Sequence, residues 1–205
     1  MSRSQFFAIE ELGRVRLSQH FFARDFFCSE IASSYRLPNT PDNPDVFKKA
    51  GGRLCEDILE PLVKAFGPIS IRSGFRSKSL NDFGHKNGLK CASSNKNCAY
   101  HIWDFPDHDG LIGAAACVVI PWALDNLDPK KDWQRLAWWI HDYLPYHRLT
   151  FFQKQFSFNI GWHESPRREI YSHIEPKGWL TKEGMLNQYG DHSEMYAGFP
   201  KLEKI

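Results

Sequence analysis

The segment Ile69-Ser70-Ile71-Arg72-Ser73-Gly74-Phe75-Arg76-Ser77-Lys78-Ser79-Leu80-Asn81 decides the fold that we expect for this chain. Its opening residues alternate apolar and polar side chains, which is the pattern of a half-buried β-strand. The Ser-Gly step that follows lets the backbone bend sharply, because glycine has no Cβ. The bend presents Arg76, whose guanidinium suits a carboxylate or a polarised carbonyl held in a fixed fork geometry. We therefore predict a strand over 69–73 that ends in a ligand-facing arginine.

Apolar patterns on both sides of this segment predict the remaining core. Apolar side chains at four-residue spacing indicate a helix from Val46 to Phe66, which ends at Gly67-Pro68. The stretch Gly113–Ile120 is continuously apolar and predicts a strand buried on both faces. A further helix is predicted over 133–143, and further strands over 149–152, 156–162 and 170–174. The expected fold is α+β, with a small antiparallel sheet flanked by helices.

The length of 205 residues is expected to form one domain with appendages. We expect an N-terminal arm over 1–17, a domain over 18–175, and an irregular tail over 176–205 that packs on the domain. The polar stretch 82–98 is predicted to be a loop. Residues 101–103 are predicted to begin a second strand.

Composition limits the classes of function. The formal net charge is only +2 and no dense basic stripe is present, which argues against a nucleic-acid partner. No apolar run approaches membrane-spanning length, so no membrane partner is expected. The segment Met1–Phe7 lacks the apolar core of a secretory signal. The cysteines are scattered and odd in number, at 5, which favours reduced thiols and a cytoplasmic location.

The order of motifs resembles one enzyme family. The chain has a strand, then a Ser-Gly-Phe-Arg-Ser turn, then Ala99-Tyr100-His101, and then the small-residue strand 113–120. This order resembles that of the zinc D-Ala-D-Ala carboxypeptidase and L-alanyl-D-glutamate endopeptidase family. The lead-in His20–Ser29 and the helical segment Leu54–Leu62 extend the resemblance over roughly residues 18–120. The resemblance implies the fold shared by the hedgehog signalling domain and the D,D-peptidases. It also implies a Zn2+-dependent peptidase that cleaves peptidoglycan peptides, either as a D,D-carboxypeptidase or as an endolysin-like endopeptidase. Without a secretory signal, such a protein would be phage-encoded and released at lysis, or associated with the virion.

The resemblance also implies metal ligands. His101 takes the place of the family's first zinc ligand, and three protein ligands plus water make a hydrolytic zinc site. The second ligand is an Asp in the family. Here the strand pattern puts Cys117 at that position, whereas an ungapped reading points to the cluster Asp107-His108-Asp109.

Three residues compete for the third ligand position. If the family's aromatic–x–His motif is matched, the ligand is His163. If the Pro-Arg-Arg-Glu run that follows is matched, the ligand position falls on Asn159. His173 is the remaining choice. We favour His163, because imidazole is a better zinc ligand than an amide. We therefore predict that His101 and His163 bind one zinc ion, completed by Cys117 or Asp107.

The general base of the family is missing from its usual place. It stands three residues before the last ligand, where this chain has only apolar residues, so Asp104 of the inserted segment is the expected substitute. Arg76, Ser73 and Asn81 are expected to bind substrate, although Arg76 would alternatively be a surface residue paired with Asp82. The absent base keeps a rival hypothesis open. In that hypothesis the chain is a non-catalytic member of the same fold that acts as a cell-wall-binding or virion-structural protein.

Overall fold

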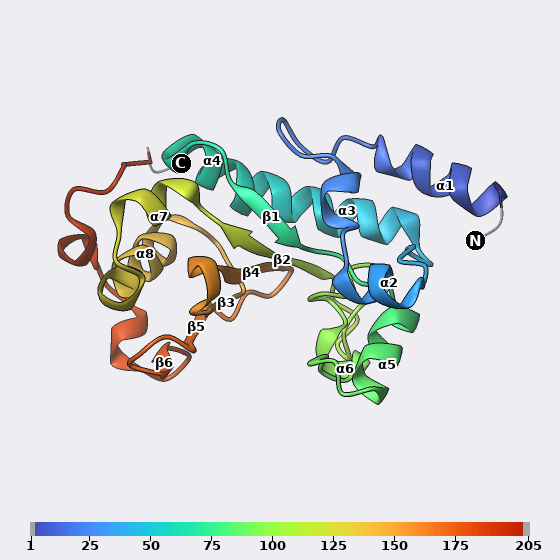
Figure 1. Ribbon diagram of the computed structural model, residues 1–205. Helices are drawn as coiled ribbons and strands as arrows, with labels where there is room; N and C mark the ends of the chain where they lie inside the picture. The colour runs from blue at the N-terminus through green and yellow to red at the C-terminus, as the bar shows by residue number, and fades with distance from the viewer. Residues whose placement is uncertain (1–2, 203–205) are drawn as a thin grey trace.

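A computed structural model describes residues 3–202 and shows a six-stranded sheet flanked by helices (Figure 1). The strands are β1 (Ser70–Ser73), β2 (Gly113–Val119), β3 (Arg148–Phe151), β4 (Phe158–His163), β5 (Glu169–Ser172) and β6 (Gly178–Thr181). Their order in the sheet is β1-β2-β4-β3-β5-β6. The predicted strands over 69–73 and 113–120 are thus confirmed to within one residue at each end.

The sheet is mixed, so the prediction of a purely antiparallel sheet was wrong. Every neighbouring pair runs antiparallel except β3 and β5, which are parallel. The reason lies in β4, both of whose edges are already occupied by β2 and β3. The chain reverses after β4, and β5 joins the sheet at the free edge of β3, where it runs in the same direction as β3.

Helices account for most of the remaining chain. They are α1 (Arg3–Gly13), α2 (Glu30–Tyr35), α3 (Pro44–Leu54), α4 (Glu60–Phe66), α5 (Lys78–Lys86), α6 (Ser94–Asn97), α7 (Pro121–Asn126) and α8 (Pro129–Tyr143). A π-helical turn, η2 (Cys55–Leu59), joins α3 to α4 without a break. Short 3-10 turns are η1 (Ala23–Phe26), η3 (Lys154–Phe156), η4 (Leu186–Gln188) and η5 (Ser193–Tyr196). The helix predicted over 46–66 is therefore confirmed, with a π turn in its middle.

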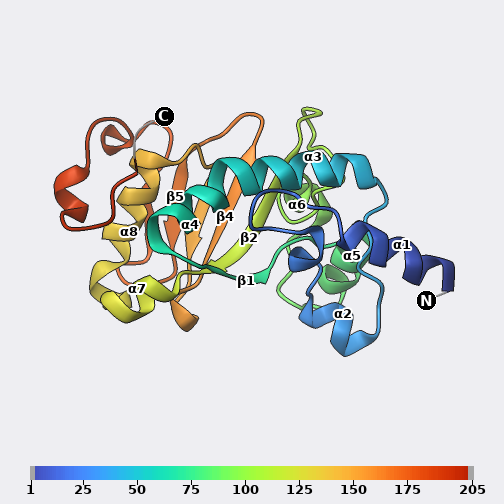
Figure 2. The same ribbon diagram turned by 90° about the horizontal axis from the view of Figure 1, so that it is seen from above.

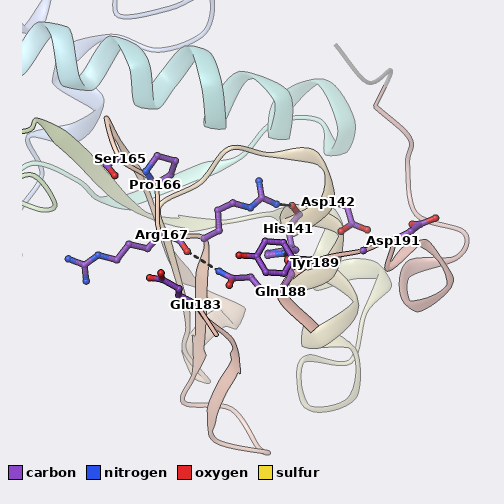
Figure 3. A pocket seen from close by; sticks show the side chains of 11 residues that line it. His141, Asp142, Ser165, Pro166, Arg167, Glu183, Gln188, Tyr189 and Asp191 are labelled. Atoms are coloured by element: carbon purple, nitrogen blue, oxygen red, sulfur yellow. Dashed lines mark hydrogen bonds between the residues drawn. The ribbon is translucent and has the colours of Figure 1, made fainter. Parts of the chain in front are cut away.

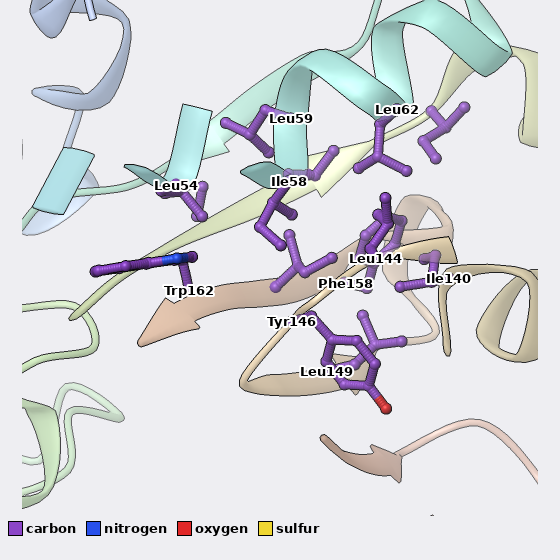
Figure 4. Packing of buried hydrophobic residues seen from close by; sticks show 14 of the residues in the cluster. Leu54, Ile58, Leu59, Leu62, Ile140, Leu144, Tyr146, Leu149, Phe158 and Trp162 are labelled. Atoms are coloured by element: carbon purple, nitrogen blue, oxygen red, sulfur yellow. The ribbon is translucent and has the colours of Figure 1, made fainter. Parts of the chain in front are cut away.

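The run from α3 to α4 lies across β2 and β4 and covers one face of the sheet (Figure 2). Side chains alternate between the two faces of a strand. The helix-facing residues of β2 and β4 are Ala114, Ala116, Val118, Phe158, Ile160 and Trp162. They pack with Leu54, Ile58 and Leu62 of the helical run, and Figure 4 shows these three with Phe158 and Trp162. All of these side chains are at most 8% exposed. The opposite face of β4 carries Asn159, Gly161 and His163, and this is the face on which the candidate site is built.

Three local predictions are corrected by the structure. The stretch 82–98 is partly helical, because Ser77 caps α5 by accepting the N–H of Leu80 and because Leu80 is buried. Residues 101–103 form a buried turn with one isolated bridge, Cys98 to Ile102, and not a strand. The tail over 176–205 contributes β6 to the sheet, and residues 203–205 lie outside the described part.

The predicted N-terminal arm over 1–17 contains helix α1, and residues 1–2 lie outside the described part. None of the helices between residues 3 and 202 has the length and apolar character required to cross a bilayer.

Candidate functional site

A cleft of about 660 Å³ opens on the face of the sheet opposite α3 and α4. Ser73, Cys117 and Asn159 line it from three neighbouring strands. Ser73 pairs with Cys117 across β1 and β2, and Cys117 pairs with Asn159 across β2 and β4. Residues paired in this way present their side chains side by side on one face. The three polar side chains therefore form the floor of the cleft.

His101 lies directly beside this floor. Asn159 Nδ2 is 3.2 Å from His101 Nε2, and His101 Nδ1 is 3.4 Å from the carbonyl oxygen of Gly74. These contacts fit a neutral ring that donates from Nδ1 and accepts at Nε2. Burial, together with the nearby Arg76 guanidinium, lowers the pKa of His101 to about 4. His101 is therefore uncharged at neutral pH.

Arg76 and His101 line the same cleft, as predicted. The N–H of Arg76 donates to the carbonyl oxygen of His101 at 2.8 Å, which joins the turn after β1 to the His101 segment. The Arg76 guanidinium donates to Asn81 Oδ1 and to Cys91 Sγ, both at 3.2 Å. Asp82 instead pairs with Lys78 at 3.0 Å, so the alternative of an Arg76–Asp82 pair was wrong.

Asn81 does not line the cleft and is fully buried behind Arg76. Its amide oxygen accepts from Arg76 and, at 2.8 Å, from Asn97, while its amide nitrogen donates to the carbonyl of Ala92 and to Ser94. Asn81 therefore positions Arg76 and is not a ligand-facing residue.

Gly74 has a role that differs from the predicted one. A Cβ built on Gly74 would lie 2.7 Å from a ring carbon of Phe26, closer than real Cβ contacts allow. Glycine is needed at the end of β1 because the Phe26 ring packs against the backbone there, and not because the turn needs a left-handed conformation.

The cleft is strongly basic. The cationic side chains that line it are Arg72, Arg76, Lys90, Lys96, Arg148 and Lys154, whereas Glu30 is the single acidic one. Arg148 donates to Glu169 at 2.6 Å, and Arg72 donates to the hydroxyl of Ser157 at 3.4 Å. Among residues 3–202, no carboxylate pairs with Lys90, Lys96 or Lys154. Positive charge gathered in a cleft in this way attracts anions.

Zinc does not fit this cleft. His101, Cys117 and Glu30 are the usual zinc donors in its lining, but they are not gathered around one point: among the described residues, the group of three such donors close enough to hold an ion is Asp107, His108 and Asp109. Burial raises the pKa of the Cys117 thiol despite the opposing effect of Arg72 and Ser157, so the thiolate that would bind zinc is disfavoured. The surrounding cations would repel a dication.

Asp104 does not lie in the cleft. Its side chain is fully buried, and its Oδ2 accepts the N–H groups of Asp42 at 2.7 Å and of Asn43 at 3.3 Å, just before α3. Burial raises the pKa of this carboxyl group. The expectation that Asp104 replaces the missing base is therefore corrected, since Asp104 fixes the chain ahead of α3.

His163 and Asp107 meet in a different place from His101. His163 Nε2 is 3.2 Å from Asp107 Oδ2, and the His163 ring stacks on that of His147 with centroids 4.5 Å apart. These residues line a separate cavity of about 430 Å³. Asn159 and His163 lie four residues apart on one face of β4, a separation of roughly 13 Å.

The ring of Tyr100 covers the residue between them. A Cβ built on Gly161 would lie 2.9 Å from Tyr100 Cε2, so Tyr100 packs directly on the backbone of Gly161. His101 and His163 are thus kept apart, and the structure does not bring them together around one ion.

The Asp107 loop contains a group that could hold a metal ion. Asp107, His108 and Asp109 each offer a donor atom, and these atoms lie within 4.8 Å of one another. Partial burial acts to raise the pKa of Asp107, but the N–H groups of Leu111 and Asp109 and the neighbouring His163 lower it below its usual range. Burial and the neighbouring His163 lower the pKa of His147 to about 3.

A third cavity, of about 620 Å³, lies where α8 meets the C-terminal segment (Figure 3). His141 Nδ1 contacts the Tyr146 hydroxyl at 2.7 Å, and His141 Nε2 contacts the Gln188 carbonyl at 3.0 Å. The Gln188 amide donates to the carbonyl of Arg167 at 3.2 Å. These polar groups are used to hold the C-terminal segment in place.

Comparison of the chain with known protein families, with curated proteins and with solved structures gave no match.

Sequence reasoning missed most of the basic side chains of the cleft. Arg72 was detectable, because it occupies a polar position of an alternating strand. Lys90 and Lys96 lie in a stretch whose lysines look like an ordinary solvated loop, and Lys154 lies in a connection between strands. Only the tertiary structure gathers them around His101.

Proposed function

We propose that this chain binds an anionic peptide in the basic cleft and does not cleave it. The observation that carries the proposal is the set of cationic side chains around a polar, uncharged floor, with Glu30 as the only acid in the lining. Carboxylates bind well to such a surface, because charge-assisted hydrogen bonds from Arg and Lys are stronger than neutral ones.

The resemblance to the peptidoglycan peptidases suggests the ligand. The peptides of peptidoglycan carry several carboxylates, so their charge is complementary to the cleft. Arg76 is pre-positioned by Asn81, and its backbone is tied to His101, so its guanidinium would contact a ligand carboxylate with little loss of conformational entropy. In this proposal the protein is a cell-wall-binding member of the peptidase-like fold.

The absence of cleavage follows from the donor set. The zinc donors that line the cleft, His101, Cys117 and Glu30, are not close enough together to hold one ion, and the acidic residue expected to act as base, Asp104, lies elsewhere. Without three ligands around one point, a metal-activated water is not supported.

The test is calorimetric titration of the protein with a synthetic peptidoglycan stem peptide and with the same peptide fully amidated at its carboxyl groups. We expect the acidic peptide to bind and the amidated peptide to bind at least ~tenfold more weakly, since a charge-assisted hydrogen bond contributes about 1.5–3 kcal/mol. Arg76→Ala should weaken binding of the acidic peptide by a similar factor. Arg14→Ala, a solvent-exposed arginine that pairs with Glu10 in the α1 region, is the matched control and should bind as the wild type does.

Mass spectrometry of the same peptide after prolonged incubation with the protein and added Zn2+ tests the second half of the proposal. We expect intact peptide. Zinc-dependent cleavage that is lost in His101→Ala would overturn the non-catalytic proposal and favour the zinc peptidase that the resemblance implies. Equal binding of the acidic and amidated peptides, or no binding of either, would overturn the anionic ligand.

A further inference from the structure

Arg72 lines the basic cleft from β1 and carries a charge that the protein does not neutralise. Its Nη1 donates to the hydroxyl of Ser157 at 3.4 Å, and no carboxylate among residues 3–202 forms an ion pair with it. Arg148 in the same cleft differs, because Glu169 lies 2.6 Å from its Nε. A guanidinium that faces a cleft without an acidic partner is suited to an anionic ligand.

A bulge in β1 explains why Arg72 and Ser73 both reach the cleft. Side chains of a regular strand alternate between its two faces. Ile71 pairs with Val118 and packs against the hydrophobic core, whereas the next paired residue is Ser73, opposite Cys117. Arg72 is therefore the extra residue of the bulge, and Arg72 and Ser73 both line the cleft. Bulges often redirect a side chain beside a functional site in this way.

Ser157 holds the Arg72 guanidinium beside the floor of the cleft. Ser157 is fully buried, and its hydroxyl donates to the carbonyl oxygen of Lys154 at 2.9 Å. Because its proton is committed to this bond, the hydroxyl oxygen acts as an acceptor toward Arg72. The contact occupies one of the five N–H donors of the guanidinium and leaves others for a ligand.

Arg72 and Arg76 act at different positions along this floor. Ser157 and Asn159 are two residues apart in an extended segment and both line the cleft, a separation of roughly 7 Å. Arg72 contacts Ser157 at one of these positions. His101 contacts Asn159 at the other, and its carbonyl oxygen accepts the N–H of Arg76. One carboxylate is bound by one guanidinium fork, so two guanidinium groups at separate positions correspond to two acid groups.

We propose that Arg72 is a second carboxylate-binding residue of the cleft, and that the ligand is a peptide with two acid groups, one bound by Arg76 and the other by Arg72. This inference rests on the proposed function, because it places both acid groups on the anionic peptide already assigned to the cleft. The uncharged floor residues Ser73 and Asn159 offer hydrogen bonds to the peptide backbone that joins the acid groups. Ser157 is a positioning residue, since it is buried and acts through Arg72.

The test is calorimetric titration with a synthetic stem peptide that carries two free carboxyl groups, and with two derivatives in which one or the other carboxyl group is amidated. We expect the wild type to bind the diacid at least ~tenfold more tightly than either monoamide, since each lost acid group removes a charge-assisted hydrogen bond. Arg72→Gln should bind the diacid at least ~tenfold more weakly than the wild type does. Its affinity for the monoamide that lacks the acid group held by Arg72 should be unchanged.

Ser157→Ala tests the positioning role. This variant keeps the Arg72 charge but removes the acceptor that holds the guanidinium, so we expect a smaller loss, of about two- to fivefold, in affinity for the diacid. The monoamide that is insensitive to Arg72→Gln should be insensitive to Ser157→Ala as well, whereas a merely structural effect would weaken both monoamides. Circular dichroism checks that both variants remain folded.

Arg167→Gln is the matched control. Arg167 is an exposed arginine that lines other cavities and not the basic cleft, so its loss should leave the affinity for all three peptides unchanged.

The inference alone is overturned if the wild type binds the diacid and Arg72→Gln binds it equally well, or if Arg72→Gln weakens both monoamides by the same factor. If the wild type binds none of the three peptides, the proposed function fails and this inference fails with it.

Discussion

Two polar regions share one face of β4 but have opposite chemistry. Around Asn159 the cleft is basic, its histidine is neutral, and its neighbours Ser73 and Cys117 are uncharged. Around His163 the hydrogen-bonding side chain is the carboxylate of Asp107, from a loop that also carries Asp109. Strand β4 presents Asn159 to one region and His163 to the other, and both side chains lie on the same face of the strand. The loops packed on the strand, and not the strand itself, therefore determine which ligand each region suits.

Tyr100 keeps the two regions distinct. Its ring packs on Gly161, between Asn159 and His163, and the Arg148 guanidinium lies 5.6 Å from the ring centroid. The neighbouring residue, His101, belongs to the basic cleft. The segment Tyr100-His101 therefore lines the basic cleft with His101 and separates it from the His163 region with Tyr100.

We expect the largest loss of stability from Gly113→Ala, which lies beside His163 at the start of β2. The new Cβ would lie 2.2 Å from the carbonyl oxygen of Ala99, which is backbone and cannot move aside easily. We expect the free energy of unfolding to fall by about 3 kcal/mol or more in urea denaturation. Gly52→Ala is the control, because its nearest neighbour, the carbonyl oxygen of Leu17, is at an ordinary 3.7 Å. That variant should be neutral or up to about 1 kcal/mol more stable. Equal stability of Gly113→Ala and the wild type would contradict the packing described.

Gly161→Ala changes the packing of Tyr100 between the two regions. The neighbour here is a side chain, Tyr100, that can shift by a few tenths of an ångström, so we expect a smaller loss of about 1–3 kcal/mol in the free energy of unfolding. Displacement of Tyr100 should also weaken binding of the acidic peptide in calorimetric titration, because Tyr100 lines the cleft. A variant with wild-type stability and wild-type peptide affinity would show that Tyr100 is not a wall between the regions.

The neutral state of His101 predicts a pH dependence of the free energy of unfolding. Its pKa is about 4 in the folded protein and about 6.5 in an unfolded chain, so the unfolded state binds more protons between these values. Stability from this group is therefore fully present above about pH 6.5 and is lost as the pH falls toward 4. His101→Gln should show a pH dependence of the unfolding free energy that is shallower by up to about one proton over this range. Identical slopes for the wild type and His101→Gln would refute the neutral histidine.

The smallest expected effect belongs to Lys154→Ala at the rim of the cleft. Lys154 is exposed, so its loss should weaken binding of the acidic peptide only by about two- to fivefold, and the binding should become less sensitive to salt. Lys48→Ala, a partly exposed lysine that pairs with Asp45 on α3, is the control. If both variants lose affinity equally, the effect is one of net charge and not of the cleft.

Much of the fold was predictable from local sequence. The alternation over 69–73, the apolar stretch over 113–120 and the four-residue spacing over 46–66 each correspond to an observed element, because burial of one face imposes these periods directly. The parallel pairing of β3 with β5 was not predictable in this way. It depends on which strand edges are already occupied, and that is a property of the whole sheet.

The candidate site was predictable only in part. The expectation that Arg76 and His101 share a cleft is confirmed, because the turn after β1 and the His101 segment are joined by a backbone hydrogen bond. Asn159, the alternative that was set aside because imidazole binds zinc better, is the residue beside His101. The stronger zinc donor, His163, was therefore the wrong choice for a partner of His101. The register of β4 decides which of its side chains reaches the cleft, and it places Asn159 there.

Local sequence was enough to predict the strand and helix periods, the arginine after β1, and histidine, carboxylate and thiol side chains at suitable spacings. The contacts of His101 with Asn159 and of His163 with Asp107, and the lysines that surround the first pair, became visible only in the folded chain. Local periods depend on neighbouring residues in the chain, whereas the charge and donor set of a site depend on segments far apart in sequence. Those segments are brought together by strand order and by the packing of Tyr100 on Gly161.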